Sequence, residues 1–246
     1  MTTLVETENA KDCSNTCNVS RKHSSDTHHP IPLETVGVHA PDHPAIGRYM
    51  GQHSSFAGSL VGERLYFHAC TQSLDTALLR SFQASGPSLR FAHGGGYLCR
   101  SPAVYWTNSL EFALLWCFLG GSDRHDEEVS VPRSGLIFVS RLDISCLATS
   151  RTLVIRPPEG DVEEIEFVKW CKNNKELAYA IPSDGASTVG ANEHDLIASR
   201  IPMNNLQWVE SHGIGQSQNI WIYAACDEYV STSLANHGIE ILLFSA

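Results

Sequence analysis

Hydrophobic and polar positions follow two different periods along most of the chain, which predicts a mixture of strands and helices. Short runs rich in β-branched and aromatic residues predict strands over 64–70, 103–107, 135–144, 219–226 and 239–246. Apolar positions three and four residues apart predict helices over 73–85, 108–119 and 162–174. The pattern leaves two segments open: 194–202 fits a short strand or a loop, and 226–238 fits a helix or an extended segment. Because strands and helices do not alternate regularly, the predicted fold class is α+β.

Residues at the ends of two of these helices have the properties of helix caps. Ser73 stands before the first helix as an N-cap, and Gly86 after it supplies a stop. Asn108 and Glu111 have the three-residue spacing of a capping box at the start of the next helix, which the glycine pair at 120–121 ends. These residues set the expected bounds of both helices.

Residues 1–55 are rich in Ser, Thr, Asn, His and Pro and show no sustained apolar period. Such a composition predicts a disordered or loosely attached arm, followed by one domain over 56–246. Five residues of the arm are of metal-ligating type, namely Cys13, Cys17, His23, His28 and His29. Their spacing matches no compact zinc pattern, and no apolar residues flank them to form a small core. We therefore expect a polar tail and no metal site.

The formal net charge of −10 disfavours a role in coating nucleic acid or a membrane surface, because an acidic protein repels phosphate groups. A local basic groove is compatible with that charge. No run approaches the ~20 apolar residues that cross a bilayer, and the N-terminal segment lacks the apolar core of a secretory signal. These features predict an intracellular protein, cytoplasmic or nuclear, with no membrane partner. In those compartments the eight cysteines are expected to be reduced thiols.

A histidine lies near the end of the first predicted strand, in the segment FHACT at 67–71. Three further segments follow in order: the helix LDTALLRSF, the strand AVYWT at 103–107 and the helix LEFALLWCF. In this order the four segments resemble the ADP-ribosyltransferase fold, the group that includes the poly-ADP-ribose polymerases and the diphtheria-type toxins. The similarity looks closest to bacterial and fungal members with a His-Tyr-Gln or His-Tyr-acid triad. It covers about residues 64–246 and implies a split β-sheet core with flanking helices.

The resemblance implies that NAD+ is the substrate. The expected reaction is transfer of mono-ADP-ribose to a macromolecular acceptor such as a protein, or hydrolysis of NAD+ by a glycohydrolase. By resemblance, His68 hydrogen-bonds a hydroxyl of the adenosine ribose and Tyr105 stacks on nicotinamide, which is a flat cation. The same comparison places Ala69 and Thr71 in the cofactor-binding segment. Ala69 replaces the glycine usual in the family, and a side chain there hinders close approach of a ribose to the backbone.

The third residue of the triad is expected at the start of a late strand. Gln218, just ahead of the apolar run that begins at Ile220, is the best candidate, and Gln216 and Asn219 are rivals. The nearest acids, Glu210 and Glu228, open no strand. A glutamine in this position departs from the catalytic glutamate of the best-known transferases. An amide can position a ribose hydroxyl or an acceptor group but cannot act as a base.

Two other readings of these residues are open. The first is a transferase-like module that has lost its chemistry and binds a nucleotide, ADP-ribose or a protein partner. The second is an unrelated α+β interaction domain in which His68 is hydrogen-bonded locally and Tyr105 belongs to the core. Trp106 and Trp116 are expected to belong to the core and not to contact a ligand. Cys70 is expected to be inert, because no base adjoins it in the sequence.

Overall fold

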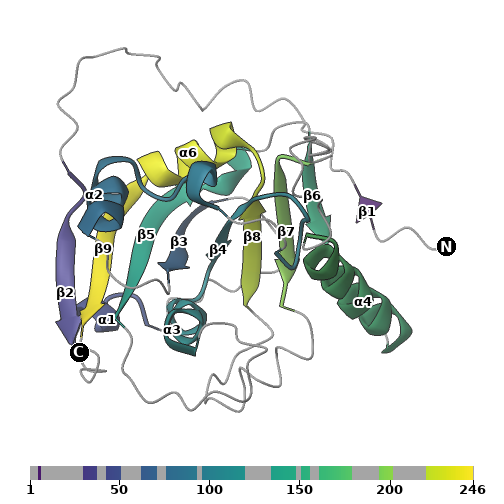
Figure 1. Ribbon diagram of the computed structural model, residues 1–246, viewed down its shortest axis with the longest axis horizontal. Coiled ribbons are helices and arrows are strands. Elements are labelled where there is room, and N and C mark those ends of the chain that lie inside the picture. The colour runs from purple at the N-terminus through teal and green to yellow at the C-terminus, as the bar shows by residue number, and fades with distance from the viewer. Residues whose placement is uncertain are drawn as a thin grey trace.

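The structure of the protein is a computed structural model that describes residues 5–6, 30–37, 43–50, 62–70, 76–92, 96–119, 134–147, 151–155, 161–178, 194–201 and 220–245. Nine strands within these ranges form one sheet in the order β1-β6-β7-β8-β4-β3-β5-β9-β2 (Figure 1). The strands are β1 (Val5–Glu6), β2 (Leu33–Gly37), β3 (Glu63–Cys70), β4 (Val104–Thr107), β5 (Gly135–Asp143), β6 (Thr152–Ile155), β7 (Leu196–Arg200), β8 (Trp221–Ala225) and β9 (Gly238–Ser245). Most neighbours are antiparallel, while the pairs β2–β9 and β6–β7 are parallel.

Helices cover both faces of this mixed sheet, which confirms the α+β class predicted from the sequence. They are α1 (Pro44–Gly47), α2 (Thr76–Ser85), α3 (Leu110–Leu119), α4 (Asp161–Ala178) and α6 (Glu228–Asn236), with short 3-10 turns at Leu89–Phe91 and Ile144–Leu147. The two segments that the pattern left open are therefore the strand β7 and the helix α6. None of the helices in the described ranges combines the length and the apolar character needed to cross a membrane.

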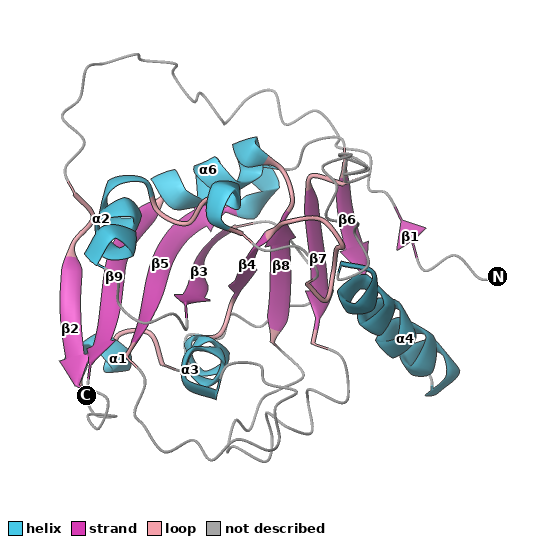
Figure 2. Ribbon diagram, viewed as in Figure 1, coloured by secondary structure: helices cyan, strands magenta, loops and turns pink. Residues whose placement is uncertain are grey.

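The helices form two layers with the sheet between them (Figure 2). On the side that we call the α2/α6 face, Phe82 and Leu234 of these helices pack against Tyr66, Trp106 and Phe138 of the sheet. On the opposite side, the α3/α4 face, two clusters form. The first joins α3 and α4 to the strands β6, β7 and β8, and the second joins α1 and α3 to β3, β5 and β9. Burial of these apolar residues on both faces is the main source of stability.

β3 and β4, the two strands at the centre of the sheet, pair with each other much less extensively than neighbouring strands usually do. β3 pairs with β5 along its whole length, from Glu63 opposite Asp143 to Cys70 opposite Leu136. With β4, on its other side, β3 shares the single Cα pair of Phe67 and Thr107. β4 in turn pairs with β8 along its whole length. The sheet therefore consists of two halves, β2-β9-β5-β3 and β4-β8-β7-β6-β1, which meet at a seam between β3 and β4.

Side chains on the α2/α6 face hold the halves together across this seam. The rings of Tyr66 in β3 and Tyr223 in β8 make an edge contact with centroids 5.1 Å apart. Trp106 in β4 makes a similar contact with Phe138 in β5, at 5.9 Å. Aromatic pairs of this kind contribute about 0.5–1.5 kcal/mol each beyond the burial of their surface. The packing of α6 over both halves adds to this, because Ser140 Oγ of β5 donates a hydrogen bond of 2.7 Å to the carbonyl oxygen of Leu234.

The ends of two helices show which expected caps are correct. Gly86 ends α2 as predicted, with a positive φ of 67° and a hydrogen bond from its N–H to the carbonyl of Phe82. At α3, Ser109 and not Asn108 is the cap, since Ser109 Oγ accepts a hydrogen bond of 3.1 Å from the N–H of Phe112. Asn108 instead accepts a hydrogen bond of 2.8 Å from the N–H of Trp221, which ties the start of α3 to β8. Ser73 and the glycine pair at 120–121 lie outside the described residues.

The prediction that residues 1–55 form a loosely attached arm is wrong for part of that range. β2 pairs in parallel with β9, and Val36 within it is fully buried. α1 follows, and its Ala45 packs in the same cluster as Val36. Arg48 forms an ion pair with Glu240 that fastens this region to β9, and a second ion pair with Glu34 within β2. The folded unit therefore begins well before residue 55, and the five cysteines and histidines considered as metal ligands lie outside the described residues.

Replacing Gly86 with alanine should destabilise the fold strongly. A Cβ at this position would lie 2.7 Å from the Cβ of Ala235 in α6, and the positive φ is costly for any L side chain. We expect the free energy of unfolding to fall by about 2–4 kcal/mol in chemical denaturation. Gly37→Ala is the matched control, because nothing lies within 4 Å of an added Cβ there. Equal stability of the two variants would contradict the expected close packing of α2 against α6.

Candidate functional site

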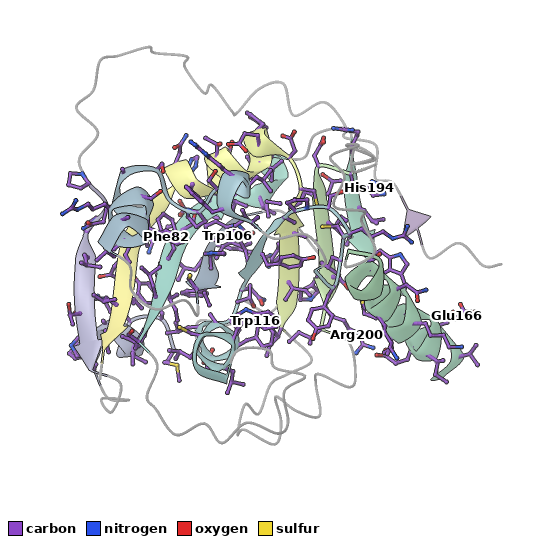
Figure 3. The ribbon with its side chains drawn as sticks, viewed as in Figure 1. Phe82, Trp106, Trp116, Glu166, His194 and Arg200 are labelled. Atoms are coloured by element: carbon purple, nitrogen blue, oxygen red, sulfur yellow. The ribbon has the colours of Figure 1, made fainter. Side chains whose placement is uncertain are left out.

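His68 lies on β3 at the seam, and its ring bridges the two halves of the sheet. Since a carbonyl oxygen can only accept, the ring Nδ1 donates the 2.8 Å hydrogen bond to the main-chain carbonyl of Tyr105 in β4. On the α2/α6 face the ring lies against Trp106, with centroids 5.5 Å apart, and against Phe82 of α2, at 5.8 Å. Figure 3 shows Phe82 and Trp106 between the sheet and the helices of that face. The histidine is thus fixed in orientation by one polar and two aromatic contacts.

These surroundings also determine the protonation state of the ring. Burial lowers the pKa of His68 from its usual 6.5 to about 4, and the hydrogen bond to Tyr105 opposes this only in part. The imidazole is therefore neutral at pH 7, with its proton on Nδ1. Nε2 then carries a lone pair that can accept a hydrogen bond from a hydroxyl group. Within the described part of the chain, Nε2 has no hydrogen-bond partner.

Tyr105 is adjacent to His68 through its backbone, but its side chain lies on the other face of the sheet. Side chains alternate along β4, so that Trp106 joins the cluster under α2 and α6 while Tyr105 packs into the cluster of the α3/α4 face. The structure therefore brings the two predicted triad residues into contact and directs their rings away from each other.

The hydroxyl of Tyr105 binds the segment that follows the glycine run at 94–96. Tyr105 Oη accepts hydrogen bonds from the N–H groups of Leu98, at 3.0 Å, and Cys99, at 3.3 Å. Burial raises the pKa of Tyr105 well above its usual 10, so the hydroxyl stays protonated. Gly96 passes so close that a Cβ there would lie 2.0 Å from Tyr105 Oη. Gly96, the last of the three consecutive glycines at 94–96, therefore has a packing role, which the sequence alone does not reveal.

The remaining predicted site residues fall into two groups. Ala69 is half-buried on β3, where it packs against the cluster of α1 and α3 on the α3/α4 face. Glu228 is exposed in the first turn of α6 and opens no strand, as expected. The others lie outside the described residues, namely Thr71, Glu210, Gln216, Gln218 and Asn219. The strand expected after Gln218 is present as β8.

Two cysteines near Tyr105 were not singled out as site residues from the sequence. Cys99 Sγ lies 3.7 Å from Tyr105 Oη and donates a hydrogen bond of 3.2 Å to the carbonyl of Ser101. Cys226, after the end of β8, packs in the same cluster. They are 127 positions apart, as 226 − 99 = 127, and no local sequence pattern indicates their proximity. Trp106 is buried in the core, as predicted, and Trp116 of α3 packs partly buried on the opposite face.

Comparison of the chain with known protein families, with curated proteins and with solved structures finds no significant match. Across the ranges that the structure describes, no three side chains of His, Cys, Asp or Glu are grouped so that they could hold a metal ion. The relationship to ADP-ribosyltransferases is therefore a hypothesis that depends on the sequence segments and on the geometry at the seam.

Tyr105→Phe should destabilise the protein, because it leaves the buried N–H groups of Leu98 and Cys99 without their acceptor. We expect the free energy of unfolding to fall by about 1–3 kcal/mol. Tyr223→Phe is the matched control: its hydroxyl is also buried, and within the described part of the chain it has no hydrogen-bond partner. That variant should be as stable as the wild type or slightly more stable in the same denaturation experiment. The reverse order of stability would contradict the assigned hydrogen bonds.

The low pKa of His68 predicts a loss of stability in weak acid. Between about pH 6.5 and about pH 4, the unfolded chain binds a proton at this position that the folded protein excludes. Acid therefore favours the unfolded state, and the free energy of unfolding should fall by up to about 3 kcal/mol across this window. His68→Asn keeps a donor for the Tyr105 carbonyl but does not titrate. Denaturation curves at several pH values should show a smaller acid loss for the variant, and parallel losses would refute the assignment.

Proposed function

We propose that the protein is an NAD+-using enzyme, either an ADP-ribosyltransferase that transfers mono-ADP-ribose to a macromolecule or an NAD+ glycohydrolase. The observation that carries the proposal is the state of His68: a neutral ring, fixed by the Tyr105 carbonyl, with Nε2 as an acceptor. A ribose hydroxyl is a suitable donor to such a nitrogen. The histidine also lies where β3 and β4 share a single Cα pair, which is the place that a split-sheet transferase would use for its dinucleotide.

The contacts of His68 support binding of an uncharged hydroxyl over binding of a phosphate. A protonated imidazole would attract the pyrophosphate of NAD+, but the low pKa keeps the ring uncharged at neutral pH. Its aromatic neighbours, Phe82 and Trp106, offer no positive charge. The predicted role at the adenosine ribose is therefore the one that suits this environment.

The proposed third residue remains Gln218. β8 begins three residues later, and β8 is the neighbour of the strand that carries Tyr105. Because an amide cannot remove a proton, Gln218 would position the acceptor or a ribose hydroxyl during departure of nicotinamide. Hydrolysis by water suits such a site as well as transfer to a protein does.

A second candidate function is a module that binds NAD+ or ADP-ribose without reaction. The observation in its favour is the hydroxyl of Tyr105, which is engaged by Leu98 and Cys99 on the face opposite His68. A tyrosine used in this way stabilises the fold and does not by itself offer a surface beside the histidine.

His68→Ala should weaken NAD+ binding by roughly two- to tenfold, the usual worth of one hydrogen bond. His237→Ala is the matched control, because His237 also directs Nδ1 to a carbonyl, that of Ser233, but is exposed on the last turn of α6. The purified wild type and both variants are titrated with NAD+, and released nicotinamide is measured by chromatography. Free ADP-ribose would indicate hydrolysis, and ADP-ribose attached to added protein would indicate transfer.

Four outcomes of these measurements separate the candidate functions. Nicotinamide release that His68→Ala reduces and His237→Ala preserves supports the enzyme. Release that also falls in Gln218→Ala, with NAD+ binding retained, supports the proposed third residue. Binding of NAD+ without release favours the binding module. Absence of both binding and release from the folded wild type would refute both candidates.

A further inference from the structure

Two thiols on the α3/α4 face come from distant parts of the chain and converge beside Tyr105. Cys99 follows the glycine run and is buried, and Cys226 follows β8 and is half-buried. Both belong to the cluster that includes Ala224 and Ile222 of β8.

The position of Tyr105 accounts for their proximity. Cys99 Sγ lies 3.7 Å from Tyr105 Oη. The Cα partner of Tyr105 in the neighbouring strand is Ala224. Cys226 is two positions further along, so it lies on the same side of the strand as Ala224 and Tyr105. The pairing of β4 with β8 therefore places both thiols on the face of the sheet that carries the Tyr105 ring.

Each of the two thiols shifts the pKa of the other. A hydrogen bond between the thiols lowers the pKa of Cys99, which the contact with Tyr105 also favours. The same contact raises the pKa of Cys226, and burial and the carboxylates of Asp195 and Asp227 act in the same direction. Of the two thiols, Cys99 is therefore the one that loses its proton more readily, while Cys226 stays protonated.

We propose that Cys99 and Cys226 form a reversible disulfide when the protein meets a hydroperoxide. The inference does not depend on the proposed function. Both thiols pack in one cluster of the α3/α4 face, so closing the bond needs movement of two side chains and no rearrangement of strands.

The chemistry balances with the peroxide as oxidant. The Cys99 thiolate attacks one peroxide oxygen, the O–O bond breaks, and the leaving hydroxide or alkoxide takes up a proton. The sulfenic acid that results on Cys99 is then attacked by the sulfur of Cys226. The S–O bond breaks, the departing hydroxide takes the proton of Cys226, and water is released. Two thiols are oxidised to one disulfide while one peroxide is reduced, and an added dithiol reverses the change.

The disulfide would fasten the segment around Cys99 to the end of β8. In the reduced protein this segment is held by the two hydrogen bonds to Tyr105 Oη. A covalent link between positions 99 and 226 closes a long loop of the unfolded chain and so stabilises the folded state. Oxidation should therefore make the fold more resistant to heat.

The test treats the purified full-length chain with hydrogen peroxide, blocks the remaining thiols with an alkylating reagent, and identifies linked peptides by mass spectrometry. We expect a Cys99–Cys226 peptide, loss of two hydrogens from the intact mass, and a rise in melting temperature on the order of 5–10 °C that a dithiol reverses. Cys99→Ser and Cys226→Ser should each abolish the linked peptide and the temperature shift. Cys117→Ser is the matched control, since Cys117 is also a buried thiol that donates to a carbonyl, that of Cys70.

The mapping of the wild-type chain decides the question even if a serine variant folds poorly. Recovery of Cys99 and Cys226 as separate alkylated peptides, after peroxide has oxidised other cysteines of the same sample, would overturn the proposal. A temperature shift that persists in a folded Cys226→Ser variant would also overturn it. The expected result is one specific link whose loss follows either substitution and not Cys117→Ser.

Discussion

The hydrogen bond from His68 to the carbonyl of Tyr105 is the contact on which the centre of this sheet depends. In an ordinary sheet the main chains of neighbouring strands supply such bonds at every second residue. Here β3 and β4 share one Cα pair, and a side chain supplies the next link across the seam. Aromatic contacts on the α2/α6 face complete the connection between the halves. A residue singled out for chemistry therefore has a structural duty as well.

The structural role of His68 also explains why the tautomer and the protonation state of its ring are well defined. The carbonyl that joins the strands also selects the tautomer, because it can bind only a protonated nitrogen. Burial between Phe82 and Trp106 keeps the second nitrogen unprotonated. A structural role of His68, as a locally hydrogen-bonded histidine, is thus compatible with a functional role in binding a ligand. The hydrogen bond that gives His68 its structural role also leaves Nε2 with the lone pair that ligand binding needs.

The sequence predicted those elements whose side chains repeat a clear pattern. β3, β5, β8 and β9 carry continuous apolar runs, and α2, α3 and α4 show helical spacing, so each was found within a few residues. β2 was missed because it is an edge strand in which one of five residues is buried, and the surrounding composition is polar. The short strand β6 was missed for a similar reason, since four residues between polar segments give too weak a signal. Ser109 was missed as the cap of α3 because Asn108 beside it is an equally good capping residue.

For the candidate site, the sequence indicates which residues to consider but not the direction in which their side chains point. Short motifs identify His68 and Tyr105, yet which face of a sheet a side chain occupies depends on strand pairing and pleat, which are properties of the whole fold. The contact of Cys99 with Cys226 is beyond sequence reasoning for the same reason, because it arises from strand order and the path of a distant segment. Local sequence patterns therefore identify candidate residues, and the topology of the sheet determines which of these residues are in contact.

The alternation along β4 sets a strict condition on how a dinucleotide could use both triad residues. Tyr105 and Trp106 are consecutive, so the ring beside His68 is Trp106, which is buried, and the ring of Tyr105 lies across the sheet. Stacking of nicotinamide on Tyr105 and a hydrogen bond from a ribose to His68 therefore belong to opposite faces. A bent NAD+ that made both contacts would have to pass through the sheet. This path is closed even at the seam, because the edge contact of Tyr66 with Tyr223 and the hydrogen bond from His68 to Tyr105 join the two halves there. One dinucleotide therefore cannot use His68 and Tyr105 together in the two roles that the resemblance implies, and a transferase site beside His68 would have to work without stacking on Tyr105.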